Sequence, residues 1–397
     1  MAHLSKRFSQ ISESQTVALT SLMNQMKRKG IDVVGLGAGE PDFDTPDHIK
    51  EAAIQSIKDG FTKYTAADGI PELKESICDL IKEEHGAEYS PGEVVVTVGA
   101  KHAVYQGILA VCDPGDEVIL PAPYWVSYPE QIKLAGATPK VIETSDETNF
   151  KISPEQLKDA ITDKTRLLIL NSPSNPSGSV YTKEEIDRLV EVIKESGIYV
   201  MSDEIYDKII YDDLEFVSLT SYPEIREQLL LVNGVSKSFA MTGWRIGYLA
   251  CPKEIATAIK RYQGHSTSNP TSISQKAAVA AIQGQKEFIK DMLKAFTERR
   301  DYVYRRLNAI PGVKCVKPQG AFYAFPNISY YFGKSYKGTE VNSSPELCQH
   351  LLQNFNVAIV PGSAFGMDTN VRLSFATSMQ VLEKALDRIE AGLKALA

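Results

Sequence analysis

The feature that most constrains the fold is a succession of short, continuously apolar runs that alternate with helix-like stretches. The runs cover residues 94–98, 117–120, 139–142, 166–170, 199–202, 229–232 and 246–250. Two of the intervening helices begin at sequences typical of capping boxes, Ser153 with Gln156 and Thr182 with Glu185. Continuous apolar strands connected by helices indicate an α/β fold, with a mostly parallel sheet covered by helices on both faces.

Residues suited to binding or chemistry follow the carboxyl ends of these runs. They are Gly99 to Lys101, Tyr124 with Trp125, Asn171 to Gly178, Asp203 to Tyr206, and Ser236 with Lys237. Ligands of such sheets bind beyond the carboxyl ends of the strands. A helix is expected to start near Lys101, and the free N–H groups at a helix start favour an anion. The sequence therefore predicts a site built at one sheet edge from several loops.

The N-terminal residues contain a glycine pattern that needs interpretation. A helix is expected over 14–29, ended by Gly30, and another over 47–58 with Thr45-Pro46 as its N-cap and first residue. Between them, Gly35, Gly37 and Gly39 resemble part of a dinucleotide fingerprint, which requires a helix opening at the glycines. Glu40-Pro41-Asp42 follows instead, so we interpret this segment as irregular backbone that approaches a ligand at Gly39.

The C-terminal part of the chain predicts a second, smaller unit. A long helix is expected over 288–307, strands over 321–325 and 357–360, then the segment VRLSFA (371–376) and a final helix with an apolar face. We expect a large domain of residues 46–285, a small α/β domain of residues 286–397, and an N-terminal segment, residues 1–45, that joins the small domain.

Composition excludes several classes of function. The net charge of −7 argues against a general nucleic-acid binder. The five cysteines form no C-x-x-C pair and the six histidines are isolated, so neither a disulfide framework nor a metal site is indicated. The sequence lacks a run of about 18 apolar residues, so no membrane association is expected. These features are typical of a cytoplasmic protein that keeps free thiols.

One lysine stands in a chemically informative setting. Lys237 lies between two serines, Ser236 and Ser238, in a turn between apolar runs, and Arg245 follows eight residues later. An amine can condense with an aldehyde, while hydroxyls and a guanidinium can hold a phosphate. A cofactor that carries both groups fits this set. The segment S-K-S followed by T-G-W-R-I-G-Y resembles the lysine segment of fold-type I aminotransferases, which use pyridoxal phosphate.

The resemblance extends over nearly the whole chain. It includes GEPDFDTP, PYWVSYPE, the Asn175-Pro176-Ser177-Gly178 run, SDEIYDKI and VRLSFA, in this order. The chain looks closest to subgroup Ib, the bacterial-type aspartate aminotransferases, some members of which also transaminate prephenate. The fold implied is that of fold-type I enzymes, with a large and a small domain.

The resemblance implies roles around the cofactor ring. Lys237 would bond the cofactor's aldehyde and later act as the base that moves the substrate proton. Asp203 would pair with the ring nitrogen and keep it protonated. Tyr206 and Asn175 would hydrogen-bond the phenolic oxygen, and Trp125 would stack on the ring. Lys237, Asp203 and Tyr206 are the expected catalytic residues.

The resemblance also implies a phosphate site shared between subunits. Backbone N–H groups of Ala100 and Lys101 would bind the phosphate together with Ser236, Ser238 and Arg245. Family members complete this site with a tyrosine from the neighbouring subunit, which would be Tyr64. The active unit implied is therefore a homodimer with shared active sites.

The resemblance also implies a substrate site, at the end of the active site away from the phosphate. Arg372 would clamp the α-carboxylate bidentately, with Gly39 adding a backbone contact and Trp125 and Asn175 facing the substrate. Animal-type enzymes hold the distal carboxylate with a second arginine, for which we find no counterpart. In the resembled subgroup the side chain of Lys101 and the hydroxyl of Thr16 are suited to that task.

The function implied is transamination between L-aspartate and 2-oxoglutarate, giving oxaloacetate and L-glutamate, with prephenate to arogenate as an additional reaction. Two alternatives stay open. One is another fold-type I enzyme, such as an aromatic or alanine aminotransferase or a carbon–sulfur lyase. The other is a regulator that senses pyridoxal phosphate, but such regulators carry an added DNA-binding module, for which few residues precede Gly35.

Overall fold

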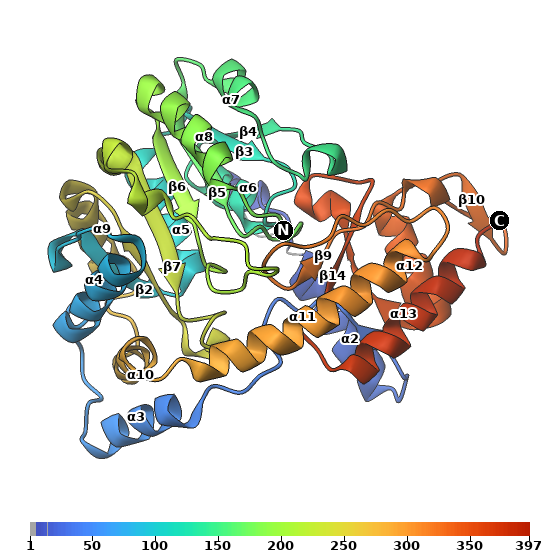
Figure 1. The fold of residues 1–397 in the computed structure, drawn as a ribbon, viewed down its shortest axis with the longest axis horizontal. Coiled ribbons are helices and arrows are strands. Elements are labelled where there is room, and N and C mark those ends of the chain that lie inside the picture. The colour runs from blue at the N-terminus through green and yellow to red at the C-terminus, as the bar shows by residue number, and fades with distance from the viewer. Residues whose placement is uncertain (1–4, 14) are drawn as a thin grey trace.

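The computed structural model describes residues 5–13 and 15–397 (Figure 1). Its central element is a seven-stranded sheet in the order β2-β8-β7-β6-β5-β3-β4. The strands are β2 (Val94–Val98), β3 (Glu117–Pro121), β4 (Thr138–Ile142), β5 (Thr165–Asn171), β6 (Tyr199–Asp203), β7 (Leu229–Gly234) and β8 (Ile246–Ala250). Neighbouring strands are parallel except where β8 pairs with β2 and β7. The predicted α/β class with a mostly parallel sheet is confirmed.

Helices cover both faces of this sheet, because alternate strand residues are buried on opposite sides. Val95 packs in a cluster with α5 (Ala100–Val111), α6 (Ser127–Leu134) and α9 (Lys253–Ser266). Val94 and Val96 pack in another cluster, with α3 (Asp47–Lys58), α4 (Pro71–His85) and α10 (Ser272–Gln283). On that second face, α7 (Pro154–Ala160) and α8 (Lys183–Ser196) cover β5 and β6. Both predicted capping boxes are present.

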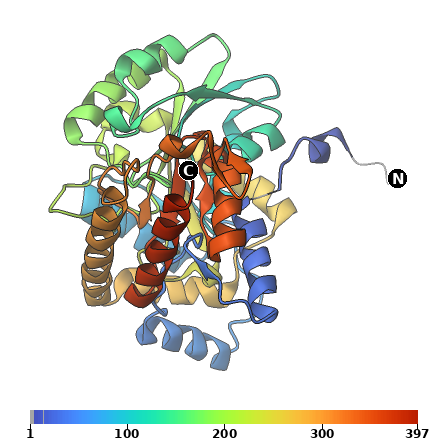
Figure 2. The ribbon, with the colours of Figure 1, turned by 90° about the vertical axis from the view of Figure 1, so that its right-hand side faces the viewer.

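A second group of elements lies beside the sheet (Figure 1). Its strands are β1 (Val34–Gly35), β9 (Tyr323–Ala324), β10 (Lys334–Tyr336), β11 (Thr339–Val341), β12 (Val357–Ala358), β13 (Val360–Pro361) and β14 (Val371–Ser374). Its helices are α2 (Gln15–Arg28), α11 (Glu287–Asn308), α12 (Ser344–Phe355) and α13 (Met379–Lys394). Because β1 pairs with β12, the N-terminal segment is joined to the C-terminal region. The short helix α1 (Lys6–Ser9) extends away from the body (Figure 2).

Helix α11 connects the two groups of elements. Ile289, near its beginning, packs in the core that α3, α4 and α10 form against the sheet. Met292, Phe296, Val303 and Leu307, further along, pack in the core of the C-terminal region. The domain boundaries expected at residues 45 and 285 stay a prediction.

The strand expected over 321–325 is limited to β9 (Tyr323–Ala324), and two further differences from the sequence-based expectation have a tertiary cause. Thr45 does not cap α3: its hydroxyl donates to Ala240 O at 2.7 Å and accepts from Trp244 Nε1 at 3.0 Å, so Pro46 is the N-cap residue. The strand expected over 357–360 is divided into β12 and β13, because β12 pairs with β1 whereas β13 pairs with β14. In both cases, contacts with residues distant in the sequence determine the local structure.

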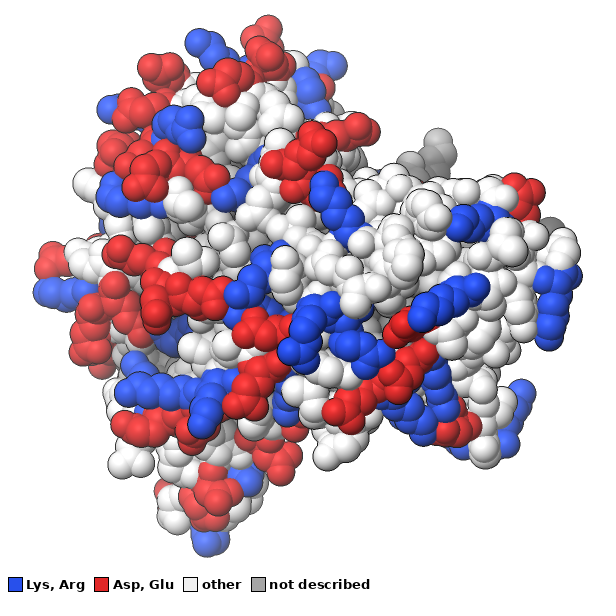
Figure 3. Space-filling model, turned by 45° about the vertical axis from the view of Figure 1, so that its right-hand side comes forward, with Lys and Arg blue, Asp and Glu red and all other residues white. Residues whose placement is uncertain are grey.

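Basic and acidic side chains are intermixed over the face shown in Figure 3. None of the helices within residues 5–13 and 15–397 has both the length and the apolar character needed to cross a bilayer.

Candidate active site

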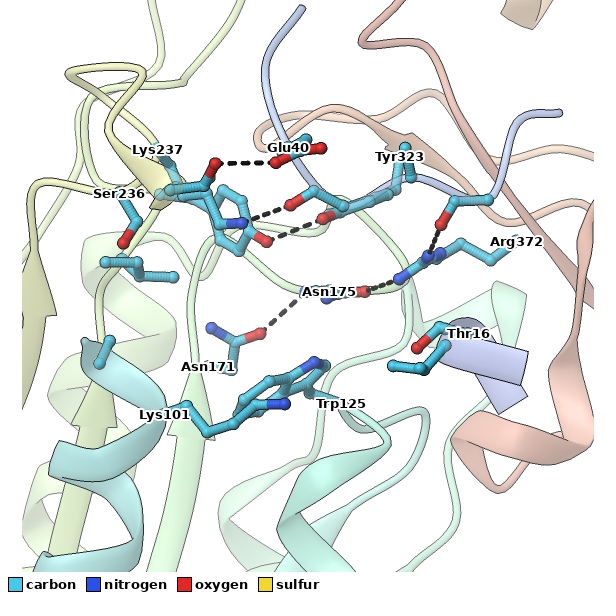
Figure 4. A pocket seen from close by; sticks show the side chains of 18 of the residues that line it. Thr16, Glu40, Lys101, Trp125, Asn171, Asn175, Ser236, Lys237, Tyr323 and Arg372 are labelled. Atoms are coloured by element: carbon cyan, nitrogen blue, oxygen red, sulfur yellow. Dashed lines mark hydrogen bonds between the residues drawn. The ribbon is translucent and has the colours of Figure 1, made fainter. Parts of the chain in front are cut away.

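A cavity of about 580 Å³ lies at the carboxyl edge of the sheet, where the sequence predicts a site. Parts of the chain that are distant in sequence line it: the ends of several strands, residues 37–40, α2, and the C-terminal residues Tyr323 and Arg372 (Figure 4). The fold thus brings sheet residues and C-terminal residues to opposite sides of one space.

Lys237 lies three residues beyond the end of β7 and points into this cavity (Figure 4). Its Nζ donates a hydrogen bond to Gly39 O. Desolvation lowers the pKa of the amine to about 8; Glu40 opposes this shift most strongly, and Arg372 and Arg245 add to it. An amine with such a pKa loses its proton readily near neutral pH, which suits a nucleophile or base.

Asp203 ends β6 and is buried below the cavity. Its Oδ2 accepts a hydrogen bond from Tyr128 Oη at 2.7 Å, and Oδ1 accepts from Ile205 N at 3.3 Å. Burial raises the pKa of this carboxyl to about 6, and the bond from Tyr128 opposes the shift. Asn171 Nδ2 donates to Asp203 O at 2.9 Å, in register with the β5–β6 pairing. The sheet therefore fixes the backbone of Asp203, and Tyr128 and Ile205 fix its carboxylate.

Two tyrosines meet between the sheet and the C-terminal region. The hydroxyls of Tyr206 and Tyr323 lie 2.9 Å apart in a hydrogen bond, and both side chains are buried. Burial raises the pKa of Tyr206 well above its ordinary value, and the neighbouring Tyr323 raises it further. Both hydroxyls therefore stay protonated and can donate.

Arg372, in β14, is a buried cation whose hydrogen-bond partners are neutral. Its Nη1 donates to Asn175 Oδ1 at 3.0 Å and its Nη2 to Gly37 O at 2.7 Å, while Nε has no partner among the described residues. The rings of Tyr323 and Phe365 lie 4.6 and 5.0 Å from the guanidinium carbon. Within the described residues, no carboxylate forms a salt bridge with it. A buried guanidinium held only by neutral acceptors is suited to receive an anionic ligand.

Close backbone packing surrounds Arg245 at the other end of the cavity. Gly99 precedes α5 with a positive φ of 80°, and a Cβ there would collide with the Arg245 guanidinium. A Cβ at Gly247 would likewise collide with Ala100 N. Arg245 Nη1 donates to Thr242 O at 2.8 Å. The guanidinium therefore lies beside the free N–H groups of the α5 start, which is a favourable arrangement for a phosphate.

Most of the predicted site residues meet in the cavity. Those that line it are Thr16, Gly39, Ala100, Lys101, Trp125, Asn175, Asp203, Tyr206, Ser236, Lys237, Arg245 and Arg372. Lys101 Nζ lies 5.0 Å from the centre of the Trp125 ring. Ser238 and Tyr64 do not line it: Ser238 is buried with its hydroxyl 3.5 Å from Asp207 Oδ1, and Tyr64 is 88% exposed on the surface.

Several lining residues were missed by sequence reasoning. They are Glu40, Tyr128, Thr242 and Tyr323, whereas Asn171 was among the strand-end residues that the sequence indicated. Tyr128 lies three residues after the predicted Trp125, so it carried a local signal. No local signal distinguishes Glu40 or Tyr323, because each reaches the cavity only through long-range packing.

One group of side chains within the described residues has metal-ligand geometry, although the sequence predicts no metal. Ligand atoms of Glu84, His85 and Asp207 lie within 4.8 Å of one another. Lys208 Nζ lies 2.5 Å from Glu84 Oε2 and 3.7 Å from Asp207 Oδ2. A lysine thus already pairs with both carboxylates, so this group carries no metal assignment.

Comparison with known proteins identifies the family. Residues 31–389 match the family described as aminotransferase class I and II. The chain is 49% identical to the aspartate aminotransferase of Geobacillus stearothermophilus, over 99% of this chain and 100% of that protein. It is 47% identical to the aspartate/prephenate aminotransferase of Cereibacter sphaeroides, over 98% of each.

The fold comparison agrees with the sequence comparison. The structure of aspartate aminotransferase from Thermus thermophilus with maleate superposes with a TM-score of 0.93 and 41% identity, covering 99% of this chain and 100% of that one. The predicted resemblance and the predicted aminotransferase class are therefore confirmed. The chain belongs to the aminotransferase class I and II family.

Proposed function

We propose that this protein transfers the amino group of L-aspartate to 2-oxoglutarate, giving oxaloacetate and L-glutamate, with pyridoxal phosphate as cofactor. The observation that carries the proposal is that Lys237 and Arg372 face one cavity without a salt-bridge partner among the described residues. An amine for an aldehyde and a guanidinium for a carboxylate are two of the groups that this reaction requires.

The residues present fit the cofactor of the family. Lys237 supplies the amine, Asp203 a fixed carboxylate for the ring nitrogen, and Trp125 an aromatic face. The α5 start beside Arg245 supplies donors for a phosphate. When bound, pyridoxal phosphate supplies an aldehyde that carries the amino group and a ring that accepts the electron pair left at the substrate Cα.

The residues near the reacting atoms divide the work by position. Lys237 Nζ takes the proton from the substrate Cα, and its lowered pKa of about 8 leaves the neutral amine available near neutral pH. Asp203, held by Tyr128, keeps its charge directed at the ring nitrogen. Tyr206 and Asn175 would donate hydrogen bonds to the phenolic oxygen of pyridoxal phosphate.

Phosphate binding is assigned to the N–H groups of Ala100 and Lys101, to Ser236 and to Arg245. Ser238 is a weaker assignment, because its hydroxyl lies near Asp207 rather than in the cavity. The exposed Tyr64 is assigned to the phosphate site of a second copy, so the proposed active unit is a homodimer. Because all five cysteines are free and buried, we place the enzyme in the reducing cytoplasm.

The substrate lies between Arg372 and the α2 side of the cavity. Arg372 binds the α-carboxylate in place of Asn175 Oδ1 and Gly37 O, and Gly39 adds a backbone contact. Lys101 and Thr16 hold the distal carboxylate. Maleate, named with the Thermus thermophilus structure, is also a dicarboxylate.

A steady-state assay tests the substrate class. Oxaloacetate production from L-aspartate and 2-oxoglutarate should require pyridoxal phosphate, and kcat/KM should exceed that for L-alanine or L-phenylalanine by at least about tenfold. If a neutral amino acid proves the better donor, the aspartate assignment is wrong and the alanine or aromatic alternative takes its place. Release of pyruvate from a cysteine conjugate would instead favour the carbon–sulfur lyase alternative.

A second reaction, prephenate to arogenate, is favoured by the similarity to an aspartate/prephenate aminotransferase. A lysine acts as a point charge and fixes the distal carboxylate less strictly than an arginine fork. The assay supplies L-glutamate and prephenate and detects arogenate. Undetectable arogenate, under conditions in which aspartate turns over, would remove this second reaction.

A further inference from the structure

Glu40 occupies a place that the assigned roles leave unused. It lines the cavity in the irregular segment between β1 and α3. Its Oε2 accepts a hydrogen bond from Thr242 Oγ1 at 2.7 Å. Thr242 belongs to the turn between Lys237 and Arg245, and its carbonyl accepts a bond from Arg245. Glu40 therefore joins the N-terminal segment to the turn that carries the reactive lysine.

The backbone next to Glu40 is bonded to both cations of the cavity. Gly37 O accepts from Arg372 Nη2, and Gly39 O accepts from Lys237 Nζ (Figure 4). In the proposed function both cations leave these carbonyls, because Arg372 turns to the substrate carboxylate and Lys237 to the cofactor. Among the described hydrogen bonds of residues 37–40, the one between Glu40 and Thr242 is then the bond that remains.

We propose that Glu40 is a positioning residue: through Thr242 it holds residues 37–40 across the cavity, and it places a negative charge beside the Lys237 amine. The inference rests on the proposed function, because Lys237 is the residue on which it acts. It adds to that function a residue that neither contacts the phosphate nor binds the substrate carboxylate.

The charges that face Lys237 support the electrostatic part of this proposal. Glu40 and Asp203 favour the ammonium form, whereas Arg372 and Arg245 oppose it, and Glu40 has the largest influence of these four. The other close neighbours are the rings of Tyr206 and Phe322, 5.8 and 5.9 Å from Nζ. Asp203 is also engaged by Tyr128. Glu40 is thus the principal anionic neighbour of the amine.

The first experiment measures the charge effect on the full-length chain, stripped of any bound cofactor by phenylhydrazine treatment and dialysis. Trace acetylation of Lys237 with acetic anhydride is followed against pH by peptide mass spectrometry. Glu40→Gln should lower the midpoint for Lys237 by about half a pH unit, because it removes a nearby negative charge. Glu40→Asp keeps the charge and should keep the wild-type midpoint.

The second experiment tests the tether, by which we mean the hydrogen bond from Thr242 to Glu40 that holds residues 37–40. Hydrogen–deuterium exchange of the peptide covering 36–42 should increase in Thr242→Val, which keeps the charge but loses the donor. It should stay near wild type in Glu40→Gln, because the amide oxygen can still accept from Thr242. The matched control is Glu254→Gln, an equal charge change at an exposed position in the first turn of α9. It should leave both measurements unchanged.

The outcomes separate the two parts of the proposal. A Glu40→Gln midpoint that coincides with wild type overturns the charge role, and unchanged exchange in Thr242→Val overturns the tether. If the midpoint falls equally in Glu254→Gln, the effect is nonspecific and the proposal is wrong. Neither measurement needs bound pyridoxal phosphate, so failure of the proposed function would show independently, as a protein that does not bind this cofactor.

Discussion

The two walls of the cavity differ in how their functional groups are held. In the sheet wall, Asp203 ends β6 and Lys237 lies just beyond β7, and parallel pairing fixes the register of these two strands. In the facing wall, formed by residues 37–40, Tyr323 and Arg372, the cation is held by an amide oxygen and a backbone carbonyl. Strand pairing fixes the backbone from which the groups of one wall project, whereas the guanidinium of the other wall is held by exchangeable partners.

From this difference we infer that one wall serves the chemical step and the other serves substrate binding. A group that must keep one geometry toward a cofactor benefits from a rigid strand end. A group that must bind and release substrates benefits from neutral acceptors, because a carboxylate forms stronger, charge-assisted hydrogen bonds and displaces them. Changes in the sheet wall should therefore affect chemistry, and changes in the facing wall should affect substrate binding.

The largest effect is expected for Lys237→Ala in the sheet wall. Loss of the nucleophile and base should lower kcat by at least about 10⁴-fold. Pyridoxal phosphate should still bind through its phosphate and ring contacts, as equilibrium dialysis can measure. Lys260→Ala, which removes a partly exposed lysine paired with Asp68 at 3.1 Å, is the control and should keep its turnover. Turnover near wild type in Lys237→Ala would remove the lysine from its assigned role.

Arg372→Ala should have the next largest effect, on binding. It removes two charge-assisted hydrogen bonds worth about 1.5–3 kcal/mol each, so kcat/KM for aspartate should fall by about 10²-fold or more. Most of this loss should appear in KM. Arg372→Lys keeps the charge but not the fork, and should recover only part of the loss. A loss confined to kcat would contradict the division between the walls.

A buried carboxyl next to the sheet wall should make the free energy of unfolding depend on pH. Glu204, next to Asp203, is buried, accepts bonds from Ser202 Oγ and Leu219 N, and burial raises the pKa of its carboxyl to about 7. The folded state therefore retains a proton that the unfolded state releases from pH ~4.5 upward. This carboxyl thus lowers the free energy of unfolding progressively as pH rises toward 7.

Glu204→Gln should remove that dependence. The free energy of unfolding of the variant minus that of wild type should increase by about 1–3 kcal/mol from pH 5 to pH 8. Urea unfolding at both values measures the difference, and the titration of Asp203 cancels because both proteins share it. An equal difference at the two pH values would show that Glu204 is not the source.

The smallest effect is expected for Tyr323→Phe in the facing wall. The ring stays, but the Tyr206 hydroxyl loses a partner worth about 1 kcal/mol, so kcat/KM should fall by about fivefold. Tyr331→Phe also removes a buried hydroxyl, bonded to Pro311 O away from the cavity, and should leave kcat/KM unchanged. Equal losses in both variants would reduce the role of Tyr323 to general packing.

Sequence reasoning was more successful for the sheet wall than for the facing wall. The expected strand over 94–98 and helix over 47–58 have the bounds found in the structure. Asp203 was predicted as a site residue because it directly follows an apolar run, and Lys237 because it lies between two serines in the turn after another. Local periodicity and the rule for parallel sheets are sufficient for such positions.

The facing wall depends on contacts that local patterns do not encode. Arg372 was assigned only through the family resemblance, and its bonds to Gly37 and Asn175 join residues hundreds of positions apart. Glu40 and Tyr323 were missed for the same reason. The strand over 357–360 was predicted as continuous because its two pairing partners cannot be read from apolar character alone.

The central claim is that both walls serve one pyridoxal phosphate-dependent transamination. An absorbance titration of the purified protein, supplied with the cofactor, tests it most directly. The account predicts a visible absorption band that L-aspartate and L-glutamate each convert to a near-ultraviolet band, that 2-oxoglutarate restores, and that neutral amino acids convert far less readily. A protein that stays colourless with the cofactor, or a visible band that aspartate leaves unchanged, would contradict it.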